Sequence, residues 1–221
     1  MGKIEILYED NHVIAAIKPY GVLSQEDITG SPDMLTLLKE YIGEKYNKPG
    51  NVFCGLVHRL DRPTGGAMIF ARTSKGARRL SESIRNGDFK KQYLCVLNGQ
   101  IKEKKGTLID FLLKDTEKKM SKVVDAHTAS AKKAILEYEV LGVKEGYSLL
   151  KVNLITGRHH QIRVQFSHLG LALYGERKYS DYNGRGQLAL WSNIITFPHP
   201  TKKEPITITA NAPDIYPFNI F

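Results

Sequence analysis

The sequence predicts an α+β fold, with a mainly antiparallel mixed sheet flanked by helices and loops. The chain has 221 residues, of which 42% are hydrophobic and 25% charged, and these are the proportions of a globular domain. Strand-like apolar runs outnumber helical ones and do not alternate regularly with them, which disfavours a parallel doubly wound sheet. No apolar run approaches the ~18 residues of a membrane-spanning helix. We therefore expect a single domain over residues 1–221.

The elements follow from local patterns. Short strands are expected at 4–8 and 13–17, on either side of a turn at Glu9, Asp10 and Asn11. A helix is expected over 33–46, where apolar residues recur at helical spacing. Thr73 is a typical N-cap and Gly87 a typical stop for a second helix ending at Asn86. The other apolar runs predict strands, and the lysine-rich runs predict loops or hairpins. The strands are 55–58, 67–71, 92–97, 134–141, 147–155, 188–197 and 206–210, and the lysine-rich runs are 102–105 and 114–122.

Positive charge is in excess and unevenly distributed. There are 32 Lys and Arg against 23 Asp and Glu, for a formal net charge of +9. Residues 59–91 hold nine basic and three acidic side chains, whereas residues 1–50 hold five and eight. Clustered positive charge is typical of a protein that binds a polyanion, although a well-solvated basic surface has the same signature.

The compartment is indicated by two weaker features. Cys54 and Cys95 are too few for a disulfide framework and indicate buried thiols in a reducing compartment. The first residues lack the apolar stretch of a signal peptide. We expect a cytoplasmic protein that does not contact a membrane.

One carboxylate stands among cations in a loop with proline and paired glycines. Asp61 lies between Arg59 and Arg62, shortly before Gly65 and Gly66. Nearby positive charge favours the ionised carboxylate, which can act as a nucleophile, a general base or a metal ligand. The alternative is an aspartate that forms a salt bridge with arginine in a turn, and spacing alone favours that alternative.

A second polar cluster runs from Thr156 to Val164 and starts a predicted helix. Ile162, Phe166 and Leu169 are spaced to form one apolar face, which leaves Arg163 on another face, free to point into a cleft. Neighbouring histidines on a helix point apart and lack zinc-type spacing, so we predict no metal site. His159 and His160 are interpreted as hydrogen-bonded structural residues or as residues that face RNA.

A third cluster places Lys90 and Lys91 just before Tyr93 in a predicted strand. An aromatic ring flanked by cations suits stacking on a nucleobase while the lysines hold phosphate. A tyrosine half-buried in the sheet is the common alternative. The sequence has no Walker-type loop, no dinucleotide glycine pattern and no Gly-x-Ser-x-Gly elbow, which disfavours the corresponding enzyme classes.

In this order, the three clusters resemble the RluA family of RNA pseudouridine synthases. The spacing of 32 residues between Asp61 and Tyr93 also fits that family. Weaker matches extend the resemblance over nearly the whole chain, from Glu9-Asp10 and Lys18-Pro19 to His199-Pro200. The residues that carry it are His58-Arg59-Leu60-Asp61, Lys91-Gln92-Tyr93, Thr156-Gly157-Arg158 and His160-Gln161-Ile162-Arg163-Val164.

The resemblance implies isomerisation of specific uridines in structured ribosomal or transfer RNA to pseudouridine, by base flipping and without a cofactor or metal. It implies that Asp61 is the essential aspartate, that Tyr93 packs on the flipped uracil, and that Arg163 pairs with Asp61. We also expect basic loops to bind the RNA. The residues concerned are Arg59, Arg62, Lys90, Lys91, Arg158, His160, Lys118, Lys119 and Lys122.

The chain departs from the family pattern at a few positions. Thr64-Gly65-Gly66 stands where Thr-Ser-Gly is usual, and Leu190-Trp191-Ser192 stands in place of Leu-His-Ala. His159 replaces a Thr or Ser, and Gln165 replaces a histidine. These departures bear on the identity of the substrate more than on activity.

Two rival interpretations belong to other classes. One is a catalytically inactive RNA-binding protein of the same fold, which the intact Asp61, Tyr93 and Arg163 argue against. The other is a metal-dependent nuclease, which the lack of clustered carboxylates argues against. We expect a monomer without an obligate protein partner and without a separate N-terminal RNA-binding module. The target uridine and the chemical intermediate are left open by the sequence.

Overall fold

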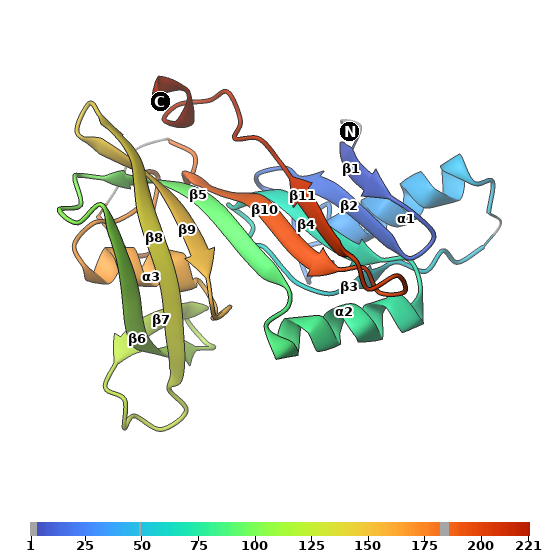
Figure 1. The fold of residues 1–221 in the computed structure, drawn as a ribbon, viewed down its shortest axis with the longest axis horizontal. Helices are drawn as coiled ribbons and strands as arrows, with labels where there is room; N and C mark the ends of the chain where they lie inside the picture. Colours follow the sequence, from blue (N-terminus) through green and yellow to red (C-terminus); the bar gives the residue numbers. More distant parts are fainter. Residues whose placement is uncertain (1–3, 49, 182–185) are drawn as a thin grey trace. The chain divides into compact units, whose positions relative to one another are not determined.

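The fold is taken from a computed structural model, which describes residues 4–48, 50–181 and 186–221. The chain divides into two compact units (Figure 1). The first combines residues 1–90 with 192–211, and the second combines residues 91–191 with 212–221. Because each unit joins two distant stretches, its boundary coincides with no single point in the sequence. Among the described residues, no helix is both long enough and apolar enough to cross a membrane.

The first unit is built on strands in the order β1–β2–β4–β10, with β3 paired to β4 and β11 paired to β10. Antiparallel pairing sets Ala16 of β2 opposite Met68 of β4. Every residue of β4 is buried, so this strand is covered on both faces. The strands are β1 (Ile6–Glu9), β2 (Val13–Lys18), β3 (Gly55–Leu56), β4 (Gly65–Ala71), β10 (Leu190–Pro198) and β11 (Pro205–Thr209).

The backbone of Gly66 in β4 lies very close to the backbone of Ser192 in β10. Gly66 has φ +114°, and an ideal Cβ there would lie 2.3 Å from the carbonyl oxygen of Ser192. Only glycine adopts this conformation without strain and leaves room for the neighbouring backbone. The second glycine of the Thr64-Gly65-Gly66 motif is therefore required by packing.

Both helices of the first unit begin at side-chain caps. The Asp33 carboxylate accepts hydrogen bonds from the backbone N–H groups of Leu35 and Thr36, which starts α1 (Met34–Lys45). The Thr73 hydroxyl accepts one from Gly76 N–H, which starts α2 (Ser74–Asn86). Such caps satisfy backbone donors that the first helical turn leaves unpaired. The α2 helix ends at left-handed Gly87, as predicted, and contacts β3 and β4.

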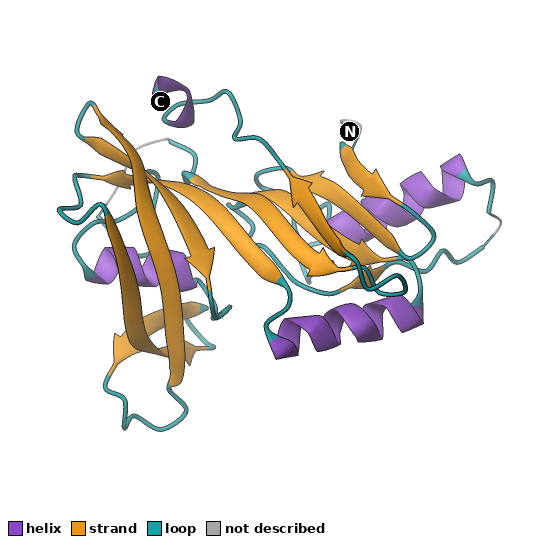
Figure 2. Ribbon diagram, viewed as in Figure 1, coloured by secondary structure: helices purple, strands orange, loops and turns teal. Residues whose placement is uncertain are grey.

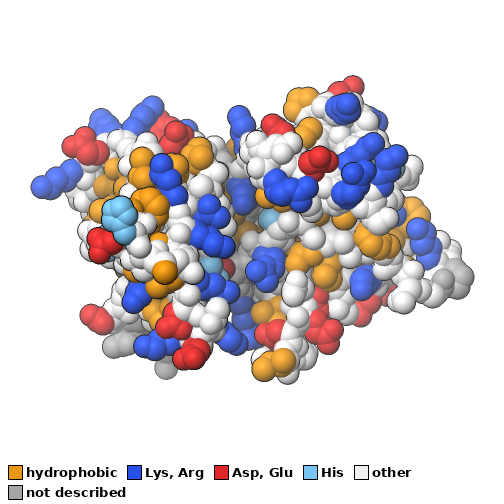
Figure 3. All heavy atoms as spheres, turned by 90° about the horizontal axis from the view of Figure 1, so that it is seen from below, with side chains coloured by type: hydrophobic (Ala, Val, Ile, Leu, Met, Phe, Trp, Pro, Cys, Tyr) orange, Lys and Arg blue, Asp and Glu red, His pale blue; other side chains and the backbone are white. Residues whose placement is uncertain are grey.

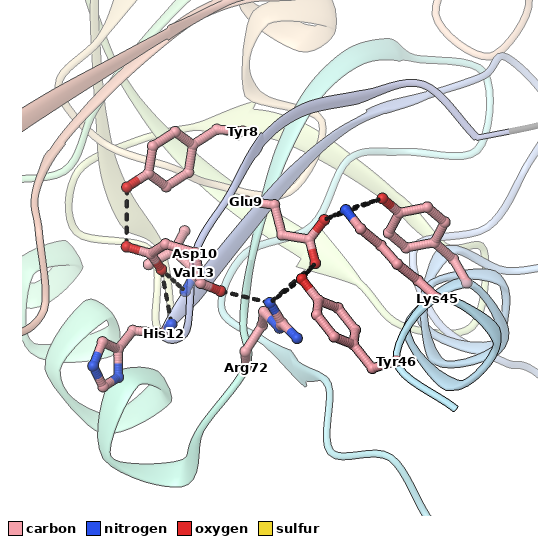
Figure 4. A network of polar contacts seen from close by, with 9 residues as sticks. Tyr8, Glu9, Asp10, His12, Val13, Lys45, Tyr46 and Arg72 are labelled. Atoms are coloured by element: carbon pink, nitrogen blue, oxygen red, sulfur yellow. Dashed lines mark hydrogen bonds and ion pairs between the residues drawn. The ribbon is translucent and has the colours of Figure 1, made fainter. Parts of the chain in front are cut away.

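A polar network fixes the turn between β1 and β2 (Figure 4). Glu9 accepts hydrogen bonds from Lys45 and Tyr46 of the α1 end, and from Arg72 just after β4. Asp10 accepts them from the backbone N–H groups of His12 and Val13 and from Tyr8. The two carboxylates of the Glu9-Asp10 motif thus connect β1, α1 and β4.

The second unit is an antiparallel sheet in the order β5–β9–β8–β6–β7. One helix, α3 (Gln161–His168), contacts β6 and β7. Leu112, Ala134 and Val164 form a core cluster in this unit, and Tyr179 packs against it. The strands are β5 (Lys90–Asn98), β6 (Lys105–Asp115), β7 (Met120–Val124), β8 (Lys132–Lys144) and β9 (Tyr147–Leu154).

The predicted fold class, an α+β fold with a mainly antiparallel mixed sheet, is confirmed, and strands predominate (Figure 2). The lysine-rich run 114–122 forms a hairpin, in which β6 and β7 pair through Leu113 and Lys122. The prediction for Leu169 was wrong. This residue caps α3 rather than extending its apolar face, and its side chain is 49% exposed. A short 3₁₀ helix, η1 (Phe218–Ile220), lies near the C-terminus.

Candidate active site

Asp61 lies in the loop between β3 and β4 of the first unit. Its backbone carbonyl accepts a hydrogen bond from Thr64 N–H at 2.9 Å, which closes a tight turn through Arg62 and Pro63. Asp61 itself is half-buried, while Arg59 and Arg62 are exposed. The turn therefore presents a carboxylate between two cations that solvent or a ligand can reach.

A second segment holds this loop in place from the other side. The Ser24 hydroxyl donates to the carbonyl of Leu60 at 2.8 Å and accepts from Leu60 N–H at 3.1 Å. Gly21 N–H donates to the Arg62 carbonyl at 2.9 Å, and Arg62 Nε donates back to the Gly21 carbonyl at 3.0 Å. The residues on both sides of Asp61 are thus fixed, as a preorganised catalytic group requires.

Lys18, the last residue of β2, is a fully buried cation beside this loop. Its Nζ donates to the carbonyl oxygens of Pro19 at 3.0 Å and Arg62 at 3.2 Å. Burial lowers the pKa of Lys18 to about 7, the negative charge of Asp61 raises it, and the positive charge of Arg62 lowers it. Lys18 is therefore an electrostatic neighbour of Asp61. Sequence reasoning missed this role, although Lys18-Pro19 was one of the weaker family matches.

His58 has a structural role in the same loop. Its Nε2 accepts a hydrogen bond from Ile69 N–H at 3.0 Å, and its ring packs against Phe89 with centroids 5.3 Å apart. Because Nε2 accepts, that nitrogen carries no proton. His58 therefore connects the loop to β4.

Tyr93 belongs to the second unit, in β5 opposite Val152 of β9. Its side chain is 5% exposed. The sequence prediction of a tyrosine in a strand is confirmed, and the ring is more deeply buried than the half-buried alternative proposed. A rigid strand fixes such a ring better than a loop would.

Arg163 of α3 is also buried, and its guanidinium is held by a carboxylate. Nε donates to Glu176 Oε2 at 2.6 Å, and an Nη nitrogen donates to Oε1 at 2.8 Å. Burial raises the pKa of Glu176, but the hydrogen bonds and charge of Arg163 outweigh it and leave that pKa below its ordinary value. This bidentate pair fixes the direction of the guanidinium. Sequence reasoning missed Glu176 in this role, because its contact with Arg163 depends on how the turn after α3 folds back.

The two histidines before α3 are hydrogen-bonded, as their structural interpretation predicted. His159 Nδ1 lies 2.9 Å from the Ser121 hydroxyl, and His160 Nδ1 lies 2.6 Å from the Tyr179 hydroxyl. Their rings stack at 3.7 Å. Burial and the positive charges of its neighbours, Arg163 first, lower the pKa of His160 to about 2, so its ring is neutral at physiological pH. Contact of His160 with RNA remains a prediction.

The basic residues predicted to bind RNA are mostly exposed. Lys90 and Arg158 are exposed, and so are Lys118, Lys119 and Lys122 on the β6–β7 hairpin. Lys and Arg side chains recur over the face that Figure 3 shows. Asp61, Arg59, Arg62 and Lys90 belong to the first unit and the other predicted site residues to the second. No three His, Cys, Asp or Glu side chains in the described parts of the chain gather as a metal site would.

Comparison with known proteins identifies the family. Residues 12–168 match the model of the RNA pseudouridylate synthase family. The chain is 32% identical to tRNA pseudouridine synthase C of Haemophilus influenzae, covering 94% of this chain and 92% of that protein. It is 28% identical to the dual-specificity RNA pseudouridine synthase RluA of the same organism, covering 95% and 93%.

Among solved structures, the human RNA pseudouridylate synthase domain containing 4 has the same fold. The TM-score is 0.80 at 20% identity, covering 95% of this chain and 88% of the other. The matched residues include the Asp61 loop, Tyr93 and Arg163 described above. The chain thus belongs to the RNA pseudouridine synthase family, and it is an isomerase that converts uridine in RNA to pseudouridine.

Proposed function

We propose that this protein acts on specific uridines of transfer or ribosomal RNA, with Asp61 as its essential catalytic residue. Relatives named for both kinds of RNA support this range. One is the tRNA synthase of Haemophilus influenzae, and another is the ribosomal large subunit pseudouridine synthase C of Buchnera aphidicola, which is 32% identical. The observation that carries the proposal is the Asp61 loop, whose flanking residues are pinned by Ser24 and Gly21.

The reaction exchanges one glycosidic bond for another. The bond from C1′ to N1 of uracil breaks, the base rotates, and a bond from C1′ to C5 forms. A proton leaves C5 and a proton is gained at N1, so no cofactor is consumed. Asp61 is the residue that acts on the nucleotide, and the buried Lys18 contacts the loop that carries it. Arg163, oriented by Glu176, is the proposed cationic partner of Asp61.

The target base must leave its stack before Asp61 can reach it. Extrusion costs a few kcal/mol, which stacking and backbone contacts offset. Tyr93 supplies a ring for stacking on the flipped uracil, worth ~1–3 kcal/mol. Arg59 is exposed two residues before Asp61 and is available to fill the vacated place in the RNA stack.

Recognition of the RNA is assigned to the basic loops. The net charge of +9 attracts a polyanion, and exposed lysines on the β6–β7 hairpin can contact phosphates. The protein is proposed to work in the cytoplasm as a monomer and as a single catalytic domain over 1–221, without an obligate protein partner.

Two experiments test this function. Pseudouridine mapping of total RNA from cells with and without the protein should reveal one or a few uridines that depend on it. With recombinant protein, Asp61→Asn should abolish tritium release from RNA labelled at C5 of uridine while leaving RNA affinity nearly unchanged, because the change is close to isosteric. Substantial turnover by Asp61→Asn would remove Asp61 from the mechanism.

A further inference from the structure

The loop between β9 and α3 is built around the side chain of Gln161. Its Oε1 accepts hydrogen bonds from the Thr156 hydroxyl at 2.8 Å and from Arg158 N–H at 2.9 Å. Thr156 N–H donates in turn to the carbonyl of Ile135 at 3.2 Å. These bonds fix the backbone of Gly157 and Arg158, which are both exposed at the surface of the second unit.

The ammonium of Lys91 lies against this loop. An ideal Cβ at Gly157 would be 3.0 Å from Lys91 Nζ, so the missing side chain at residue 157 is what leaves room for the ammonium. Lys91 stands in β5 opposite Leu154 of β9, just before the loop begins. The pairing of β5 with β9 and the loop after β9 together set the position of the Lys91 ammonium.

This ammonium is partly desolvated and is not neutralised. Burial lowers the pKa of Lys91 below its ordinary value, and no ion pair joins Lys91 to a carboxylate in the described parts of the chain. A second cation is fixed nearby in sequence, because Arg158 Nε donates to the Lys133 carbonyl at 2.9 Å. That bond uses one guanidinium nitrogen and ties the side chain to Lys133 of β8.

We propose that Lys91, Gly157 and Arg158 form a binding site for one backbone phosphate of the RNA. A phosphate supplies the negative charge that the Lys91 ammonium lacks, and it accepts two parallel hydrogen bonds from a guanidinium. The exposed glycine allows the phosphate to approach the ammonium. The inference rests on the proposed function, since it names one contact through which the enzyme holds its substrate.

The test is the salt dependence of binding to bulk transfer RNA and ribosomal RNA, measured by filter binding. Lys91→Met should flatten the slope of log affinity against log salt by ~0.7–0.9, the share of one released counterion. Gly157→Ala keeps every charge but moves the ammonium, so it should flatten the slope in the same direction. Lys144→Met, at the exposed end of β8, is the matched control and should keep the wild-type slope.

A second measurement does not depend on any variant folding. Lys91 should be modified by an amine-reactive reagent near neutral pH, because its lowered pKa increases the fraction of free amine. Bound RNA should protect it, as read by mass spectrometry. A wild-type slope for folded Lys91→Met, or no protection of Lys91 by RNA, would overturn the site. Neither measurement needs turnover, so an inactive wild-type protein that passes both would refute the proposed function and leave the site standing.

Discussion

The ammonium of Lys18 is held in the interior by two carbonyl oxygens and by the charge of Asp61. Lys18→Met keeps most of the apolar side chain and removes all three interactions. We expect kcat/KM to fall about tenfold or more, which corresponds to ~1.4 kcal/mol of transition-state stabilisation. Single-turnover rates with RNA that carries the mapped uridine would measure this. An unchanged rate would mean that Lys18 does not act on Asp61.

The same variant has a signature in stability. The pKa of Lys18 is about 7 in the folded protein and near 10.5 when the chain unfolds. Between these values the unfolded state binds the additional proton, so the free energy of unfolding of the wild type rises with pH across that window. Below about pH 7 both states are protonated, and the cost of burial is fully present. Lys18→Met should lack this rise, which urea unfolding at about pH 6, 8 and 10 would reveal.

The pair between Glu176 and Arg163 gives a pH dependence of the same sign in a more acidic window. Glu176→Gln removes the carboxylate that balances a buried guanidinium and should lower the free energy of unfolding by ~3–5 kcal/mol at neutral pH. The folded pKa of Glu176 is lowered, so its contribution is present above the ordinary glutamate pKa and is lost as pH falls through the folded value. The gap between wild type and variant should therefore narrow in acid. Unfolding at about pH 7 and pH 3.5 tests this, with Glu176→Asp as a variant that keeps the charge.

At the residue scale, the sequence could indicate Asp61, Tyr93 and Arg163 because their motifs are local. It could not indicate the partners that tune them. Lys18 reaches the loop of Asp61 from a strand 43 positions away, and Glu176 reaches Arg163 from the turn that follows α3. Such pairs depend on how strands are ordered in the sheet, and no spacing along the chain encodes that order.

At the scale of elements, local chemistry predicted the α2 boundaries to the residue, because Thr73 and Gly87 act on their own backbone. The start of α1 at Asp33 follows from the same kind of cap. The β6–β7 hairpin was harder to predict, because its strands carry lysines and acidic residues on the exposed side. β6 alternates between exposed and half-buried residues over much of its length. Pairing with β8 stabilises β6 as a strand, although the amino-acid composition of β6 gives little sign of one.

The close contact between Gly66 of β4 and Ser192 predicts that a side chain at residue 66 destabilises the fold. Gly66→Ala would place a Cβ 2.3 Å from a backbone oxygen at a φ of +114°, so the free energy of unfolding should fall by at least ~2 kcal/mol. Gly43→Ala is the control, because its Cβ would meet only Val52 at an ordinary 3.7 Å inside α1. That change should raise stability by ~1 kcal/mol. Equal effects of the two substitutions in urea unfolding would contradict the packing argument.

At the scale of the whole molecule, residues far apart in the sequence contact one another within each unit. His199 Nε2 lies 2.7 Å from Asp10 Oδ2, although the residues are 189 positions apart. Tyr216 packs edge-on against Tyr147 and Tyr174 within the second unit. The early Glu9-Asp10 motif and the late His199-Pro200 motif are thereby explained as two halves of one structural contact in the first unit.

The β6–β7 hairpin carries the last prediction, because its exposed lysines form no ion pair with a carboxylate among the residues that the structure describes. Lys118, Lys119 and Lys122 are exposed, and the turn they surround is fixed by Asp115, which accepts from Lys118 N–H. If these lysines bind phosphate, replacing all three with alanine should flatten the slope of log affinity against log salt by ~2–3, since each contact releases about one counterion. The Lys39, Lys48 and Lys144 triple variant lowers the net charge equally and uses lysines that are also exposed. A loss of slope in the hairpin variant alone would assign the contact to the hairpin. Equal losses would mean that only the total charge matters, and no loss in either would make the hairpin a solvated surface.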